Sequence, residues 1–176
     1  MAATILMHFY EDEEMAFWVF VTLMDRFNWK QLFDGKLAGL TQLLDSFACC
    51  LPSDVALHLE AHGLPPSTYA ANWMLTLFTA AFDCWSAVLQ IWDLMWLLGP
   101  EALVPAQAAV AIISHYRDRI LSCNNSNCLL VLLHHTIPQT LVHVGTLRDN
   151  ILTEAVLMQP LPIALCSLDS KPPDCP

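Results

Sequence analysis

The stretch YAANWMLTLFTAAFDCWSAVLQIWDLMWLL, residues 69–98, decides the fold of this chain. Apolar and aromatic side chains dominate it, four of them are tryptophans, and the large residues recur at helical spacing. We predict two consecutive apolar helices, the first over residues 69–79 with Ser67 as its cap and the second over residues 85–98. The pair Gly99-Pro100 predicts a sharp end to the second helix.

The sequence on either side of this stretch predicts further helices and no strand of useful length. These helices are expected over residues 14–27, 36–47, 53–62, 101–121, 128–135 and 146–158. The first of them places large side chains at spacings of three and four, which predicts a buried face: Phe17, Phe20, Met24 and Phe27. The predicted fold class is all-α, an irregular helical array packed by ridges into grooves.

Length and proline content divide the chain into two parts. Residues 1–158 are long enough to form one domain with a hydrophobic core. Residues 159–176 hold five prolines and show no helical period, which predicts a flexible Pro-rich tail.

The charge balance excludes several classes of function. Seven Lys and Arg face 17 Asp and Glu, for a formal net charge of -10, so a basic surface for nucleic acid and a polybasic membrane anchor are not expected. The chain is 56% hydrophobic and 14% charged, but no apolar run reaches the length of about 18 residues that a spanning helix needs. A helical membrane-associated protein stays open as an alternative on composition alone.

The seven cysteines are expected to be reduced thiols, several of them buried within helices. Cys123 and Cys128, with His134 and His135 downstream, form a weak zinc pattern. Adjacent histidines on a helix point about 100° apart and rarely reach one metal. We therefore predict no metal and no cofactor. The sequence also lacks a P-loop and a G-x-G-x-x-G segment, so direct nucleotide binding is not expected.

The order of large residues in the deciding stretch resembles a known family. The residues that carry the resemblance are Tyr69, Trp73, Leu77, Phe78, Ile91, Trp92 and Asp93. Two upstream segments add to it, Glu13-Glu14 with Ala16-Phe17-Trp18, and Leu37-Ala38-Gly39-Leu40. This pattern is similar to the C-terminal half of the TBC domain, the helical domain of Rab GTPase-activating proteins. The resemblance covers residues 1–158 and implies a Rab-type small GTPase as partner.

The resemblance also says which groups are missing. The family supplies a catalytic arginine from an Ile-x-x-Asp-x-x-Arg segment and a catalytic glutamine from a Tyr-x-Gln-Gly segment, and neither occurs here. Met1 is expected to follow directly after the position of the second segment. An arginine finger contributes about 10³- to 10⁵-fold in rate, or roughly 4–7 kcal/mol of barrier. We therefore expect no catalysis of its own from this chain.

Asp93, the one acid inside the second helix of the deciding stretch, allows two interpretations. A carboxylate buried among tryptophans would have a raised pKa and could act as an acid. The preferred interpretation is a structural acceptor that fixes helix packing through a backbone or indole donor. Trp73 and Trp92 are likewise expected in the core rather than around a ligand.

The leading hypothesis is regulation of Rab GTPases in vesicle trafficking, by a TBC-type domain without its fingers that is inactive or binds partners only. The alternative is a non-catalytic interaction or scaffold protein in membrane trafficking. Under either hypothesis the expected location is the cytoplasm, with recruitment to endomembranes and any peripheral membrane association running through partner proteins.

Overall fold

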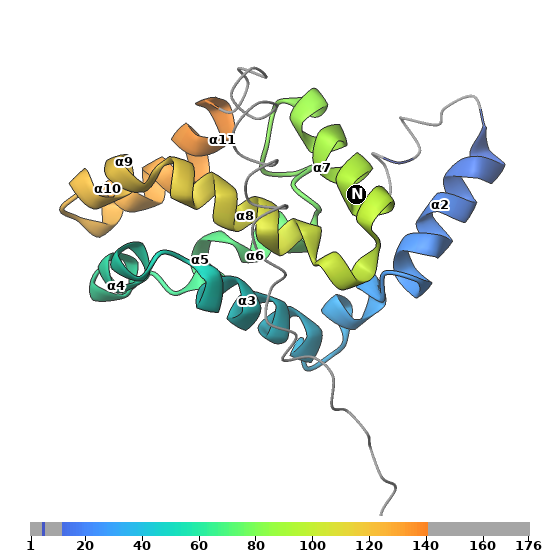
Figure 1. Ribbon diagram of the computed structural model, residues 1–176, viewed down its shortest axis with the longest axis horizontal. Helices are drawn as coiled ribbons and strands as arrows, with labels where there is room; N and C mark the ends of the chain where they lie inside the picture. Colours follow the sequence, from blue (N-terminus) through green and yellow to red (C-terminus); the bar gives the residue numbers. More distant parts are fainter. Residues whose placement is uncertain (1–4, 6–11, 141–176) are drawn as a thin grey trace, which may run out of the picture.

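The computed structural model describes Ile5 and residues 12–140, and these residues form an irregular array of helices with no strand (Figure 1). The all-α prediction is therefore confirmed. The elements in chain order are α2 (Glu13–Asp25), the 3-10 helix η1 (Trp29–Phe33), α3 (Ala38–Cys50), α4 (Ser53–Ala61), α5 (Pro66–Tyr69), α6 (Ala71–Leu75), α7 (Trp85–Leu98), the 3-10 helix η2 (Pro100–Ala102), α8 (Val104–His115), α9 (Arg117–Ser122), α10 (Ser126–Val131), the π-helix η3 (Leu132–Thr136) and α11 (Ile137–Thr140).

Helix α8 lies at the centre of the array and contacts α3, α6, α7 and α9 (Figure 1). Its alanines at 106, 108 and 109 are fully buried, and such small side chains let neighbouring helices approach closely. Pro105 occupies the first turn, where its missing N–H removes no intrahelical hydrogen bond. The core of the domain is therefore built around a helix that is buried on nearly all sides.

Helix α2 begins at Glu13, one residue before its predicted start. Asp12 is the N-cap, and its carboxylate accepts a hydrogen bond from the Met15 backbone N–H at 2.8 Å. The predicted buried face is only partly right. Ala16 and Leu23 are the buried residues of this helix, whereas Phe17 is 57% exposed. Phe20, Met24 and Phe27 are half-buried at the edge of the core, so the helix is rotated away from the predicted stripe.

Three predicted helices have the expected positions, because their ends carry clear signals. Helices α3 and α4 match their predicted ranges to within a few residues. Helix α7 ends at Leu98 as predicted, and Gly99 follows with a positive φ of 79°, which glycine adopts without steric cost. Gly39 serves a different purpose: a Cβ there would lie 2.8 Å from the Gln31 carbonyl oxygen, so it permits the close contact between α3 and η1.

Two predicted helices differ from the observed helices in ways that no signal in the sequence indicates. The helix expected over residues 101–121 is broken at Leu103, which has a φ of 47°, and again at Tyr116, where α8 gives way to α9. The helix expected over residues 128–135 is longer than predicted, because it continues through a π-helical turn into α11, which contains Pro138. The helix over 146–158 and the tail over 159–176 lie outside the described residues.

No single helix within Ile5 and residues 12–140 is long and apolar enough to cross a membrane. The segments Trp85–Leu98 and Pro100–His115 have the required length and composition only as a pair, and they are bent by 116° relative to each other.

Candidate functional site

The connection between α6 and α7 is a left-handed turn rather than a helix. Helix α6 ends at Leu75, and the next residues form the two hydrogen bonds of a Schellman motif. The Phe78 N–H donates to the Trp73 carbonyl at 2.9 Å, and the Leu77 N–H donates to the Met74 carbonyl at 3.2 Å. The prediction of one helix over residues 69–79 is therefore wrong.

The predicted cap of that helix is also wrong. Helix α5 starts at Pro66, with Pro65 in the N-cap position and no side-chain cap. Because proline at the first helical position presets φ and needs no hydrogen-bond partner for its nitrogen, the prolines replace the cap expected from Ser67.

This turn places two large residues in a conformation that normally requires glycine. Leu77 has a φ of 48° and Phe78 a φ of 67°, which costs a residue with a Cβ roughly 1–2 kcal/mol. Both side chains are fully buried, and burial of a large apolar side chain contributes about 1.5–3 kcal/mol. Burial therefore offsets the backbone strain.

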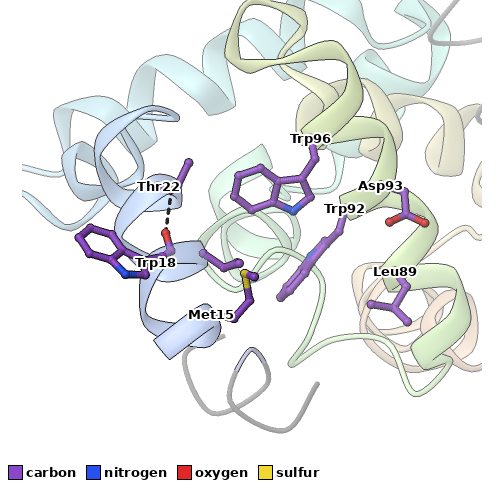
Figure 2. A pocket seen from close by; sticks show the side chains of 8 residues that line it. Met15, Trp18, Thr22, Leu89, Trp92, Asp93 and Trp96 are labelled. Carbon is purple, nitrogen blue, oxygen red and sulfur yellow. Dashed lines mark hydrogen bonds between the residues drawn. The ribbon is translucent and has the colours of Figure 1, made fainter. Parts of the chain in front are cut away.

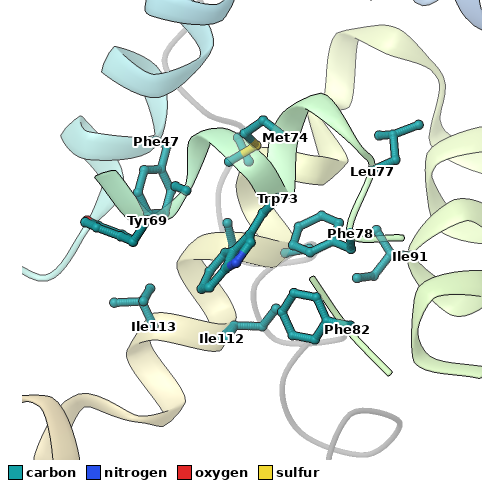
Figure 3. Close-up of a cluster of buried hydrophobic side chains, with 14 of the residues drawn as sticks. Phe47, Tyr69, Trp73, Met74, Leu77, Phe78, Phe82, Ile91, Ile112 and Ile113 are labelled. Carbon is teal, nitrogen blue, oxygen red and sulfur yellow. The ribbon is translucent and has the colours of Figure 1, made fainter. Parts of the chain in front are cut away.

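Aromatic rings pack around this turn into a continuous cluster (Figure 3). Trp73 is at its centre, with ring centroids 6.4 Å from Tyr69, 6.2 Å from Phe78 and 5.5 Å from Phe82. Burial raises the pKa of the Tyr69 hydroxyl. We call this cluster, together with Leu77, the aromatic junction.

A side-chain hydrogen bond joins helix α7 to the aromatic junction. The indole N–H of Trp92 donates to the Leu77 carbonyl at 3.1 Å in a buried position. Ile91 and Trp92 are both buried. Of the seven residues that carry the family resemblance, six are therefore brought together by α5, α6, the turn and α7, and Trp73 and Trp92 lie in the core as expected.

Asp93 is the exception. Its side chain is exposed, and it makes no hydrogen bond or ion pair with any residue that the structure describes. The prediction that Asp93 is a structural acceptor is therefore wrong, and the Trp92 indole bonds to the junction instead. The reason is helical geometry: Asp93 is one residue past Trp92, about 100° around α7, and points away from the core.

A groove of about 340 Å³ lies between α2 and α7 (Figure 2). We call it the α2–α7 groove, and it is lined by Met15, Trp18, Val19, Thr22, Leu89, Trp92, Asp93 and Trp96. At one end the ring of Phe27, two residues past α2, packs edge to face on Trp96 of α7, with the ring centroids 4.7 Å apart. The sequence pattern did not reveal this groove, because Trp18 and Trp96 fit the apolar pattern as well as any core residue.

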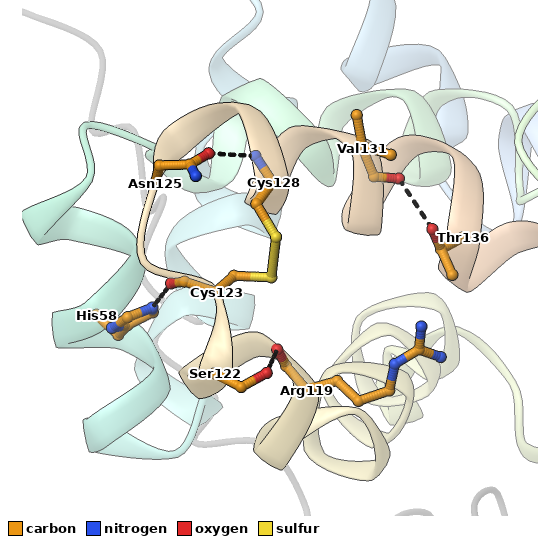
Figure 4. The surroundings of a disulfide bond; sticks show 8 residues. All are labelled: His58, Arg119, Ser122, Cys123, Asn125, Cys128, Val131 and Thr136. Atoms are coloured by element: carbon orange, nitrogen blue, oxygen red, sulfur yellow. Dashed lines mark hydrogen bonds between the residues drawn. A yellow bond between two sulfur atoms is a disulfide. The ribbon is translucent and has the colours of Figure 1, made fainter.

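Cys123 and Cys128 form a disulfide at the start of α10 (Figure 4). The expectation that all cysteines are reduced is therefore wrong for this pair, and both sulfurs of the weak zinc pattern are bonded to each other. The loop is attached to α4, because the Nε2–H of His58 donates a hydrogen bond to the Cys123 carbonyl at 2.9 Å. Among the described residues, no group of three or more His, Cys, Asp or Glu side chains could hold a metal ion.

The other described cysteines have different surroundings. Cys84 is buried, Cys49 is exposed and Cys50 is half-buried. Burial, with a smaller effect of the neighbouring Cys49, raises the pKa of the Cys50 thiol. A raised pKa keeps this thiol protonated and unreactive at neutral pH.

The helical array and its aromatic junction define an all-α domain of the TBC type. The family model for the Rab-GTPase-TBC domain matches residues 1–121. Because the match covers more than half of the chain, the chain belongs to this family.

Three curated relatives illustrate the similarity. GTPase activating protein Gyp51 of Schizosaccharomyces pombe is 28% identical over 127 residues, which is 70% of this chain and 12% of the relative. TBC1 domain family member 4 of Mus musculus is 27% identical over 140 residues, 78% of this chain and 10% of the relative. TBC domain-containing protein kinase-like protein of Homo sapiens is 35% identical over 78 residues, 44% of this chain and 8% of the relative. The chain thus spans about a tenth of the length of each.

Proposed function

We propose that this chain takes part in Rab GTPase regulation as the C-terminal half of a TBC domain that binds its partner without the two catalytic fingers. The observation that carries the proposal is a TBC-family sequence in which neither the Ile-x-x-Asp-x-x-Arg nor the Tyr-x-Gln-Gly segment occurs. Without these groups, the positive charge that stabilises the transition state of GTP hydrolysis has no source in the family's usual position.

The surroundings of two of the three described arginines, Arg117 and Arg119, support this proposal, whereas Arg26 is exposed just past α2. The Arg117 guanidinium forms an ion pair with Asp54 and lies 3.4 Å from an Asp118 carboxylate oxygen. Arg119 lies over the Tyr116 ring, with its guanidinium carbon 5.8 Å from the ring centroid. Both side chains are held by neighbours on the chain itself. An arginine finger must instead extend into the active site of the bound GTPase.

The test is single-turnover GTP hydrolysis on a panel of purified Rab GTPases, with binding of the full chain measured on the same samples. We expect saturable binding to at least one GTP-loaded Rab with no more than a few-fold acceleration, because an arginine finger alone contributes about 10³-fold or more. Acceleration of a hundredfold would show that a residue of this chain acts as a finger. Alanine variants of Arg26, Arg117 and Arg119 would then identify it.

The alternative proposal is a non-catalytic scaffold in membrane trafficking. The same binding data separate the two, because a regulator of the GTPase cycle should prefer the GTP-loaded form, while a scaffold with another partner should show no preference. In either case we propose a cytoplasmic chain recruited to endomembranes through its partners. Its net charge of -10 disfavours direct contact with anionic lipids. Fractionation before and after depletion of the bound GTPase tests this location.

A further inference from the structure

The α2–α7 groove is lined mainly by apolar side chains, is open to solvent and carries an acidic residue, Asp93, whereas the aromatic junction is buried. Met15 is 49% exposed and Trp18 is 56% exposed along one wall. Asp93 lies on the other wall without a hydrogen bond or ion pair to any described residue. Exposed apolar surface with a polar edge is typical of a site that binds another molecule.

The dimensions of the groove suit a short helix. Met15 to Thr22 on α2 and Leu89 to Trp96 on α7 each span eight residues, or roughly 10 Å along the helix axis at 1.5 Å per residue. A groove of that length between two helices accommodates about two turns of a third helix, which would insert apolar side chains at helical spacing.

The acidic residues on α2 and α7 favour a partner helix with a basic side chain. Neither α2 nor α7 contains a Lys, Arg or His, whereas Glu13, Glu14, Asp25 and Asp93 lie on them. Asp25 is paired with Lys30 at 2.8 Å, but Asp93 has no such partner among the described residues. Because an indole face also attracts cations, Trp92 and Trp96 beside Asp93 favour a basic side chain at this position.

We propose that the α2–α7 groove binds an amphipathic helix of a separate protein, which places apolar residues against Met15, Trp18 and Trp96 and a Lys or Arg against Asp93. Other occupants fit the charges less well. Residues 1–11 contain no Lys or Arg, and residues 141–176 carry two basic and four acidic side chains. A second copy of the chain brings a net charge of -10 and is repelled. The proposal does not depend on Rab binding.

The experiment measures binding of the full chain to two labelled peptides by fluorescence anisotropy. Each peptide is an amphipathic helix of about 14 residues, enough for the two bound turns and their flanks. One peptide carries a single Lys beside its apolar stripe, and the other carries Glu at that position. We expect the Lys peptide to bind at least about tenfold more tightly than the Glu peptide. Equal binding, or no binding of the Lys peptide, would overturn the proposal.

Two pairs of variants test whether the peptide binds in the α2–α7 groove. Asp93→Lys should weaken the Lys peptide about tenfold and strengthen the Glu peptide. Asp45→Lys, which makes the same charge change on the exposed surface of α3, should leave both unchanged. Met15→Glu should abolish binding, whereas Leu97→Glu, at a residue of α7 that is 79% exposed and outside the groove, should not.

Several outcomes would contradict the proposal directly. If Asp93→Lys and Asp45→Lys have the same effect, the acidic surface as a whole attracts the peptide and the groove does not. If sedimentation shows a dimer that Met15→Glu dissociates, a second copy fills the groove. Rab binding by the wild-type chain is measured separately, so failure of the groove proposal and failure of the proposed function are distinguishable.

Discussion

The aromatic junction and the α2–α7 groove both contain large apolar residues, but these residues are buried in the junction and partly exposed in the groove. Trp73 is 1% exposed and Phe78 is fully buried in the junction, while Trp18 is 56% exposed in the groove. Trp92 connects the two regions, because its indole N–H donates to the Leu77 carbonyl and its side chain lines the groove. Large apolar residues therefore do not by themselves identify the core. Whether such a residue is buried depends on whether another element of the domain packs against it.

The largest expected difference between the two regions is in stability. Trp73→Ala should lower the free energy of unfolding by about 3–5 kcal/mol, because it opens a cavity among Tyr69, Phe78 and Phe82. Trp18→Ala should change it by less than about 0.5 kcal/mol. Urea denaturation followed by circular dichroism measures both. Similar losses for the two variants would mean that Trp18 is buried in solution and that the groove is closed.

Residues with a positive φ allow a second comparison, because the same backbone conformation occurs at buried and at exposed positions. Leu77→Gly should destabilise the protein by about 2–3 kcal/mol, since the lost burial exceeds the relief of strain. Leu37 also has a positive φ, 51°, but is exposed at the start of α3. Leu37→Gly should therefore stabilise the protein by about 0.5 kcal/mol. A gain in stability from Leu77→Gly would show that strain, not packing, dominates the turn.

A single hydrogen bond gives the next test. Trp92→Phe keeps an aromatic ring but removes the donor to the Leu77 carbonyl, leaving a buried acceptor without its partner. The expected cost is about 2 kcal/mol. Trp96→Phe is the matched control on the same helix, because the Trp96 indole donates no hydrogen bond to any residue within the described range; its cost should be under about 1 kcal/mol. Equal costs would mean that ring size alone matters at both positions.

The sequence predicted the parts of this fold that local chemistry determines. Helix α4 begins beside Pro52 and ends before Gly63, and α7 ends at Gly99, because proline and glycine restrict the backbone wherever they occur. The seven residues of the family resemblance also indicated the region where the core forms. Six of them pack together.

Tertiary contacts explain what could not be predicted. Leu77, Phe78 and Leu103 adopt left-handed conformations that no local signal favours, and burial compensates for the first two. The exposure of Asp93 and Phe17 depends on how α7 and α2 are rotated, which helical periodicity alone does not fix when apolar residues lie on all sides. The groove forms only where α2 and α7 lie side by side, so the sequence of either helix alone does not reveal it.

The smallest expected effect concerns the ion pair between Asp54 of α4 and Arg117 of α9, which lies outside both regions. The hydrogen bond from Arg117 lowers the pKa of Asp54 below its ordinary 3.8. A lowered pKa in the folded state stabilises the protein above pH 3.8, and this contribution is lost as the pH falls through the lowered value.

Wild type should therefore exceed Asp54→Asn in stability at neutral pH, and the difference should shrink as the pH falls below about 4. Thermal melts of both proteins across this range measure it, with Asp45→Asn, at an exposed aspartate on α3, as the control for charge removal alone. The contribution is small because both side chains are partly exposed to solvent. A difference that does not vary with pH would show that the ion pair is absent in solution. The α4–α9 contact would then depend on apolar packing and on the hydrogen bond from the His58 ring to the Cys123 carbonyl.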